Sequence, residues 1–133
     1  MAGETNLKTL LASMAPQLDD TEWVFAEVGE EDAVPLTPLA IATFCEAEGL
    51  TLVLPQSAVD GLENVSAPMS RLTLEVHSSL EAVGLTAAVA GALAEEGISA
   101  NVIAAYYHDH IFVPKASADR ALAVLQALST STD

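Results

Sequence analysis

Basic residues are scarce in this sequence of 133 residues. Four Lys and Arg stand against nineteen Asp and Glu, which gives a formal net charge of −15 at pH 7. A surface with this charge repels phosphate backbones and anionic membranes, so we expect no binding to nucleic acid or to a membrane surface. The charge itself has two interpretations, a solvating acidic surface or an adaptation to a salt-rich habitat. The four cations are too few for the clamp that phosphoryl transfer needs; they are Lys8, Arg71, Lys115 and Arg120.

Cysteine and long apolar runs are also lacking. Cys45 has no second cysteine to pair with, so an intramolecular disulfide is excluded, as is common in the cytosol. No basic group near Cys45 in the sequence suggests an activated thiol, and we expect a small buried side chain there. No apolar run approaches the roughly 18 residues of a transmembrane helix. Residues 1–4 lack the basic and apolar regions of a signal peptide, so we expect a cytoplasmic protein.

The sequence also lacks the motifs of common enzyme classes. It has no Gly-rich phosphate loop with a lysine, no dinucleotide-binding fingerprint and no nucleophile elbow. The acids Glu46 and Glu48 could form a carboxylate pair, but a solvated turn explains them better. We therefore expect no catalytic residue and no cofactor, and we expect that the chain is not an enzyme.

Hydrophobic residues make up 51% of the chain, which is enough for a packed core. Their spacing predicts an α+β protein. Helices are expected over 5–14, 56–62, 84–96 and 117–128, strands over 22–28, 39–46, 50–54, 69–77, 99–107 and 110–113, and loops or turns at 29–38, 46–49 and 108–109. In the strand 99–107, Tyr106 and Tyr107 should point to opposite faces, with one ring packed in the core or at a dimer interface.

The two halves of this pattern echo each other, which predicts a degenerate internal repeat. We expect an N-terminal lobe over residues 1–67 and a C-terminal lobe over residues 68–133. The first half lacks a helix between its first two strands, because residues 29–38 contain two prolines and read as a loop. Neither half has the four strands of a complete βαββαβ unit. We therefore expect two incomplete lobes that lend each other a strand and fold as one unit.

Three segments resemble a known family: residues 46–53 (EAEGLTLV), 76–86 (VHSSLEAVGLT) and 105–114 (AYYHDHIFVP). They are similar to small bacterial tandem ACT-domain proteins, over roughly residues 5–128. The resemblance implies a ferredoxin-like fold, with antiparallel sheets and helices on one face. It also implies binding of an amino acid or another small metabolite at the first strand–helix loop, and regulation of a partner enzyme or formation of a homodimer. Because the first half lacks the expected helix, a ligand site is less expected there.

The loop before the predicted helix 84–96 is the leading candidate for a ligand site. A helix N-terminus offers unpaired N–H groups and partial positive charge, which suit a carboxylate or a phosphate. Hydroxyl groups, a glycine that permits close approach and the amide of a neighbouring strand would complete the pocket. The candidate residues are His77, Ser78, Ser79, Leu80, Val83, Gly84, Leu85, Thr86 and Asn101. The alternative is that the serines satisfy the loop backbone and Gly84 only makes the turn.

The three histidines offer a weaker alternative. His77, His108 and His110, with Asp109, have the ligand types of a zinc or other divalent metal site. The alternatives are that His108–Asp109 forms a turn and His110 pairs with a neighbour, or that His77 or His110 contacts a ligand. The function hypotheses are therefore a ligand-binding regulatory module, a structural or dimerisation module, and a small histidine- or metal-dependent enzyme.

Overall fold

A computed structural model of the protein describes residue 3 and residues 5–130. The chain divides into two compact units. One, here called the split unit, contains the chain up to Asp20 and then everything from Ser70 onward. The other, the inserted unit, is Thr21–Met69. Strand β1 (Pro16–Val28) passes from the first unit into the second without interruption. In this division, the described residues up to Asp20 are grouped with the C-terminal half of the chain.

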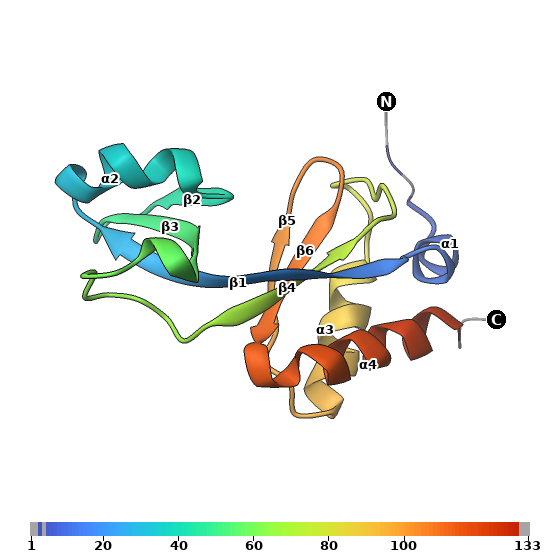
Figure 1. The fold of residues 1–133 in the computed structure, drawn as a ribbon. Helices are drawn as coiled ribbons and strands as arrows, with labels where there is room; N and C mark the ends of the chain where they lie inside the picture. Colours follow the sequence, from blue (N-terminus) through green and yellow to red (C-terminus); the bar gives the residue numbers. More distant parts are fainter. Residues whose placement is uncertain (1–2, 4, 131–133) are drawn as a thin grey trace. The chain divides into compact units, whose positions relative to one another are not determined.

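The split unit contains a ferredoxin-like arrangement (Figure 1). Strand β4 (Met69–Leu74) is followed by α3 (Leu85–Glu95), β5 (Asn101–Ala104), β6 (Asp109–Pro114) and α4 (Ala118–Thr130). The strands follow the order β1-β4-β6-β5, so the beginning of β1 supplies the fourth strand beside β4. Helix α1 (Leu7–Ala12) precedes β1. The predicted βαββαβ pattern is thus completed by a strand from the other half of the sequence.

One face of this sheet carries the main core. Every second residue of β4 and β6 points to the helices, as the period of a strand requires. The buried side chains are Leu72, Leu74, Ile111 and Val113 from these strands, Leu85, Val89 and Leu93 from α3, Ala121 and Leu125 from α4, and Leu10, Leu11 and Met14 from α1 and its end. The predicted placement of helices on one face is confirmed within this unit.

The inserted unit repeats the pattern in a reduced form. The rest of β1 is followed by α2 (Glu30–Leu36), a 3₁₀ turn (Thr37–Leu39), β2 (Ala42–Cys45), β3 (Leu50–Pro55) and a second 3₁₀ turn (Gln56–Ala58). The strand order is β2-β3-β1. A short segment then runs along the free side of β1, where Val65 pairs with Ala26 and the N–H of Ser66 donates to the carbonyl of Phe25 at 2.9 Å. A small core fills this unit, made of Val24, Ala26, Val28, Leu52 and Leu54.

The predicted loop over residues 29–38 is wrong, because α2 forms there. Three acids occupy the first turn of this helix, where the helix dipole favours negative charge. Pro35 removes one backbone donor, but it sits close to the end of the helix. The helix is capped at its C-terminus by Thr37, whose N–H and hydroxyl both donate to the carbonyl of Ala33. The first half therefore has its helix, and the argument against a ligand site drawn from its absence no longer holds.

Several element boundaries also differ from the prediction. Strand β1 begins at Pro16, six residues before the predicted start of the strand 22–28. Residues 56–62 form only a 3₁₀ turn at Gln56–Ala58. Strand β5 ends at Ala104, and the hairpin turn lies at 105–108, where the N–H of Ala105 donates to the carbonyl of His108 at 3.0 Å. The expected turn at His108–Asp109 is therefore shifted, and Asp109 pairs with Ala104 inside the ladder.

One of the two tyrosines and Cys45 were expected to be buried or packed at an interface, but all three side chains are exposed. Tyr106 and Tyr107 are 60% and 61% exposed, because they lie in the hairpin turn and not in a regular strand. Cys45, on the last strand of the sheet order, is exposed as well. The hairpin at residues 46–49 is confirmed, with reciprocal hydrogen bonds between the backbones of Glu46 and Gly49.

Candidate ligand-binding loop

The predicted ligand loop connects the end of β4 at Leu74 to the start of α3 at Leu85. Gly84 precedes the helix with φ of +102°, a conformation that side chains rarely adopt. The first helical bond runs from the N–H of Ala88 to the carbonyl of Gly84 at 2.9 Å. The N–H groups of Leu85, Thr86 and Ala87 come before that bond, so no earlier turn of α3 can accept from them. The loop therefore leads into a helix N-terminus of the kind that binds anions.

Ser78 connects this loop to the β5–β6 hairpin through a hydrogen bond. Its hydroxyl donates to Oδ2 of Asp109 at 3.2 Å, and both residues are 7% exposed. A buried polar group needs such a partner, since an unsatisfied one costs about 1–3 kcal/mol. The hydroxyl of Ser78 thus positions the loop, and this interaction uses its proton.

The remaining predicted residues of the loop divide into exposed and buried ones. The hydroxyl of Ser79 accepts a hydrogen bond from the N–H of Glu81 at 3.1 Å, and its own proton is still available to donate. Leu80 and Val83 are 66% and 83% exposed, and Thr86 is exposed too. Leu85 points into the core at 4% exposure and offers only its backbone. The groups open to a ligand are therefore backbone N–H groups, two hydroxyls and two apolar side chains.

His77 lies at the start of the loop among aromatic side chains. Its ring centre is 5.1 Å from that of Tyr107 and 6.2 Å from that of Tyr106, and the two tyrosine rings meet edge to face at 5.0 Å. Ring centres this close indicate rings packed on each other, with no space for a further group between them. The cluster joins the loop to the turn of the β5–β6 hairpin.

Asn101 lies at the end of the β5–β6 hairpin that is far from the loop. It stands at the first position of β5, opposite Phe112, and its side-chain amide is 3.5 Å from the carbonyl of Phe112. The other end of the hairpin, at Asp109, is the one that contacts the loop. Three residues of strand separate Asn101 from that end, or about 10 Å. The sequence reasoning placed Asn101 early in a strand, but it could not tell which end of that strand meets the loop.

Gly3 and Leu7 lie against the loop, which the sequence reasoning missed. A Cβ at Gly3 would be 2.7 Å from the backbone of Ser78 and Ser79, and a Cβ at Gly84 would be 3.1 Å from Cδ2 of Leu7. The apolar spacing of Leu7 with Leu10 and Leu11 predicted a helix, but no signal indicated what that helix covers.

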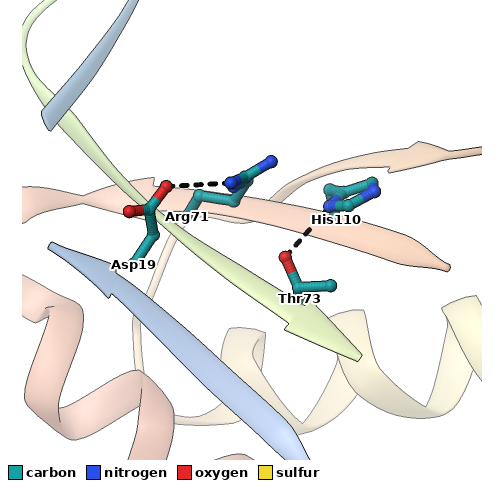
Figure 2. A network of polar contacts seen from close by, with 4 residues as sticks. All are labelled: Asp19, Arg71, Thr73 and His110. Carbon is teal, nitrogen blue, oxygen red and sulfur yellow. Dashed lines mark hydrogen bonds and ion pairs between the residues drawn. The ribbon is translucent and has the colours of Figure 1, made fainter. Parts of the chain in front are cut away.

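The three histidines do not converge. Nδ1 of His108 is 3.4 Å from the carbonyl oxygen of Val76, and Nδ1 of His110 is 3.0 Å from the hydroxyl of Thr73 (Figure 2). His77 packs with the tyrosines. Across residues 5–130 and Gly3, no three His, Cys, Asp or Glu side chains are grouped to hold a metal ion. The geometry gives no support to the alternative of a metal site.

His110 belongs instead to a polar network on the sheet. Arg71 in β4 forms an ion pair of 2.9 Å with Asp19 in β1, beside the bond between Thr73 and His110 (Figure 2). Burial, followed by the positive charge of Arg71, lowers the pKa of His110 below its ordinary value. The imidazole is therefore neutral at pH 7 and serves as a hydrogen-bond partner, since its unperturbed pKa is already about 6.5.

The corresponding loop of the inserted unit is chemically different. A cavity of about 400 Å³ lies where β1 leads into α2, against the β2–β3 hairpin. Its lining includes four carboxylates, from Glu27, Glu30, Glu46 and Glu48. These negative charges repel the carboxylate of an amino acid. The loop of the split unit has one acid, Glu81, between His77 and Thr86, and the carboxylate of Asp109 contacts it through Ser78.

Family profiles match both halves of the chain. One ACT-domain profile covers residues 2–64 and a second covers residues 67–127. The chain belongs to the ACT-domain family. Both matched profiles are ACT domains, which are typically small-ligand regulatory modules, and neither is a catalytic domain. The predicted tandem ACT architecture is therefore confirmed.

Solved structures share the fold of this chain. A protein of unknown function from Vibrio cholerae, described as a possible transport protein, is 54% identical, with a TM-score of 0.81 over 92% of this chain and 95% of that chain. The ligand-free regulatory subunit of aspartate kinase from Thermus thermophilus shares the fold at 9% identity, with a TM-score of 0.65 over 87% of this chain and 97% of that chain. Aspartokinase III from E. coli, in complex with aspartate and ADP, has a TM-score of 0.63 at 14% identity, over 86% of this chain and 33% of that chain.

No curated protein matches the chain. Among the residues that the structure describes, no helix has both the length and the apolar character needed to cross a bilayer.

Proposed function

We propose that this tandem ACT protein is a sensor module that binds an amino acid at the loop between β4 and α3 and regulates a partner protein. The observation that carries the proposal is the glycine-led start of α3, with φ of +102° at Gly84 and the N–H groups of Leu85, Thr86 and Ala87 ahead of the first helical bond. A ligand carboxylate would accept from these N–H groups and meet the positive end of the helix dipole.

The surroundings of the helix start fit the other parts of an amino acid. The hydroxyl of Ser79 keeps a proton to donate. The exposed side chains of Leu80 and Val83 offer apolar contact to a ligand side chain. The membership in a family of small-ligand regulatory modules supports the same assignment.

A thermal-shift screen of the twenty amino acids tests the proposal. A ligand at about 100 times its dissociation constant adds about 2.7 kcal/mol to the free energy of unfolding, because it binds only the folded state. For a domain of this size, we expect that ligand to raise the melting temperature by roughly 5 °C or more. Common nucleotides serve as the comparison set in the same screen. A melting temperature that none of the twenty amino acids moves would remove the main support for the sensor function.

Dimerisation is a second candidate, favoured by one edge of the inserted unit. Strand β2 stands last in the order β2-β3-β1, and Phe44 on this strand is 70% exposed. An edge strand presents unpaired backbone groups that can pair with another chain. An exposed phenylalanine next to them is typical of an interface.

Sedimentation at several protein concentrations tests the dimer. We expect Phe44→Glu to weaken association by about 30-fold or more, as the loss of a buried aromatic anchor does. Val34→Glu is the matched control, because it adds the same charge to the same unit at a side chain that is 80% exposed on α2. A wild-type protein that stays monomeric at every concentration would rule out the dimer.

A further inference from the structure

The exposed tyrosines of the β5–β6 turn have no part in the proposed ligand site. Tyr106 and Tyr107 are 60% and 61% exposed, and their ring centres lie 5.0 Å apart, edge to face. Among the described residues of the split unit, large hydrophobic side chains are exposed only here and at Leu80 and Val83 in the ligand loop. Exposed apolar groups that gather in one place mark an interaction site, whereas groups scattered singly do not.

Contacts with the ligand loop hold the tyrosine turn in place. The ring centre of Tyr107 is 5.1 Å from that of His77, and Nδ1 of His108 is 3.4 Å from the carbonyl oxygen of Val76. Figure 1 shows the turn between β5 and β6 beside the chain that follows β4. A tyrosine side chain has few rotatable bonds, so its fixation in an interface costs little conformational entropy. The turn therefore presents two pre-organised rings, Tyr106 and Tyr107, here called the tyrosine patch.

The surroundings of the tyrosine patch are acidic. The two segments that meet there are residues 75–86 and 104–110, and neither contains Lys or Arg. Their acids are Glu75 and Glu81, which are exposed, and Asp109, which is buried. A second copy of this chain would bring the same acids to the same place, because a symmetric interface pairs a patch with itself. The charge of the patch is instead complementary to a basic partner.

We propose that the tyrosine patch is the docking surface for a basic segment of the partner protein, with an arginine of that segment on a tyrosine ring. This inference rests on the proposed sensor function, since it names the chemistry of the partner. A guanidinium group over an aromatic ring gains cation–π attraction, and arginine and tyrosine are both enriched at interfaces. The carboxylates of Glu75 and Glu81 add attraction for the same basic segment.

The tyrosine ring signals in a proton NMR spectrum report directly on the patch, because both tyrosines of the chain lie in it. The probe is a blocked peptide of alternating arginine and leucine residues, and we expect it to shift these signals in a saturable way. Tyr106→Leu and Tyr107→Leu keep an apolar side chain but remove the ring. We expect at least one of them to raise the dissociation constant of the peptide about fivefold. Unchanged affinity in both variants would overturn the proposal.

A pair of matched charge variants separates the patch from the acidic surface as a whole. Glu81→Gln removes a charge beside the patch, whereas Glu95→Gln removes the same charge at the end of α3, about 15 Å along the helix from its start. We expect Glu81→Gln to weaken peptide binding about twofold and Glu95→Gln to leave it unchanged. Equal effects of the two variants, or heat of binding without any shift of the tyrosine signals, would place the peptide elsewhere on the acidic surface and contradict the proposal.

The peptide titration contains no amino acid, so its outcome is separate from that of the thermal-shift screen. If an amino acid binds and the tyrosine signals do not respond to the peptide, the docking surface is overturned and the ligand site stands. If the peptide binds at the tyrosines and none of the amino acids binds, the sensor function fails and the patch remains a docking surface for a basic segment.

Discussion

Gly84→Val is expected to lower the free energy of unfolding by about 2–6 kcal/mol and to abolish amino-acid binding. The native φ of +102° is strained for any residue with a Cβ, and such strain costs about 1–3 kcal/mol. The added Cβ would also lie 3.1 Å from Cδ2 of Leu7, and overpacking costs a further 1–3 kcal/mol or so. The branched side chain would stand where a ligand must approach the backbone at the start of α3.

Urea denaturation and titration with the amino acid found by the screen measure the two effects. Gly91→Val serves as the control, because it places the same side chain on α3 where nothing lies within 4 Å. We expect this control to keep both stability and affinity within a few tenths of a kcal/mol, as exposed sites usually do. If Gly84→Val binds the amino acid as tightly as the wild type does, the loop is not the binding site.

The sequence predicted the split unit better than the inserted one. Helices α3 and α4 carry apolar side chains at helical spacing and end at clear signals, such as Gly97 with φ of +72°. Helix α2 has no buried residue and contains Pro35, so neither apolar spacing nor composition indicated a helix. Its formation depends on the acids near its N-terminus and on tertiary context, which local patterns do not carry.

The sequence predicted which residues of the candidate site follow one another along the chain, but it did not predict which distant residues contact them. The spacing of Ser78, Ser79 and Gly84 before an apolar helix pattern predicted a loop, and the structure has a loop between β4 and α3 there. The pairing of Ser78 with Asp109 spans 31 residues, and it depends on how β6 is placed in the sheet. The same holds for Gly3 and Asn101, whose distances to the loop follow from the tertiary fold and not from local sequence.

Leu93→Ala and Leu54→Ala are each expected to lower the free energy of unfolding of the whole chain by about 2–5 kcal/mol. Leu93 is fully buried in the core of the split unit, and Leu54 is fully buried in that of the inserted unit. Strand β1 runs unbroken from Pro16 to Val28 and gives residues to both units. Loss of order in one unit would fray the strand on which the other depends, so we expect both units to unfold in one transition.

Two probes separate this outcome from independent unfolding. Fluorescence of Trp23 reports on the inserted unit, and circular dichroism at the helical band reports mainly on α3 and α4 of the split unit. We expect the two denaturation curves to coincide in the wild type and to shift together in each variant, which is the test of two-state behaviour. Leu39→Ala, at a side chain that is 50% exposed, is the matched control and should change stability by less than about 0.5 kcal/mol. If Leu93→Ala shifts the helical transition and leaves that of Trp23 in place, the lobes fold separately. The shared strand would then be a link between two independent domains and not the structural basis of a single folding unit.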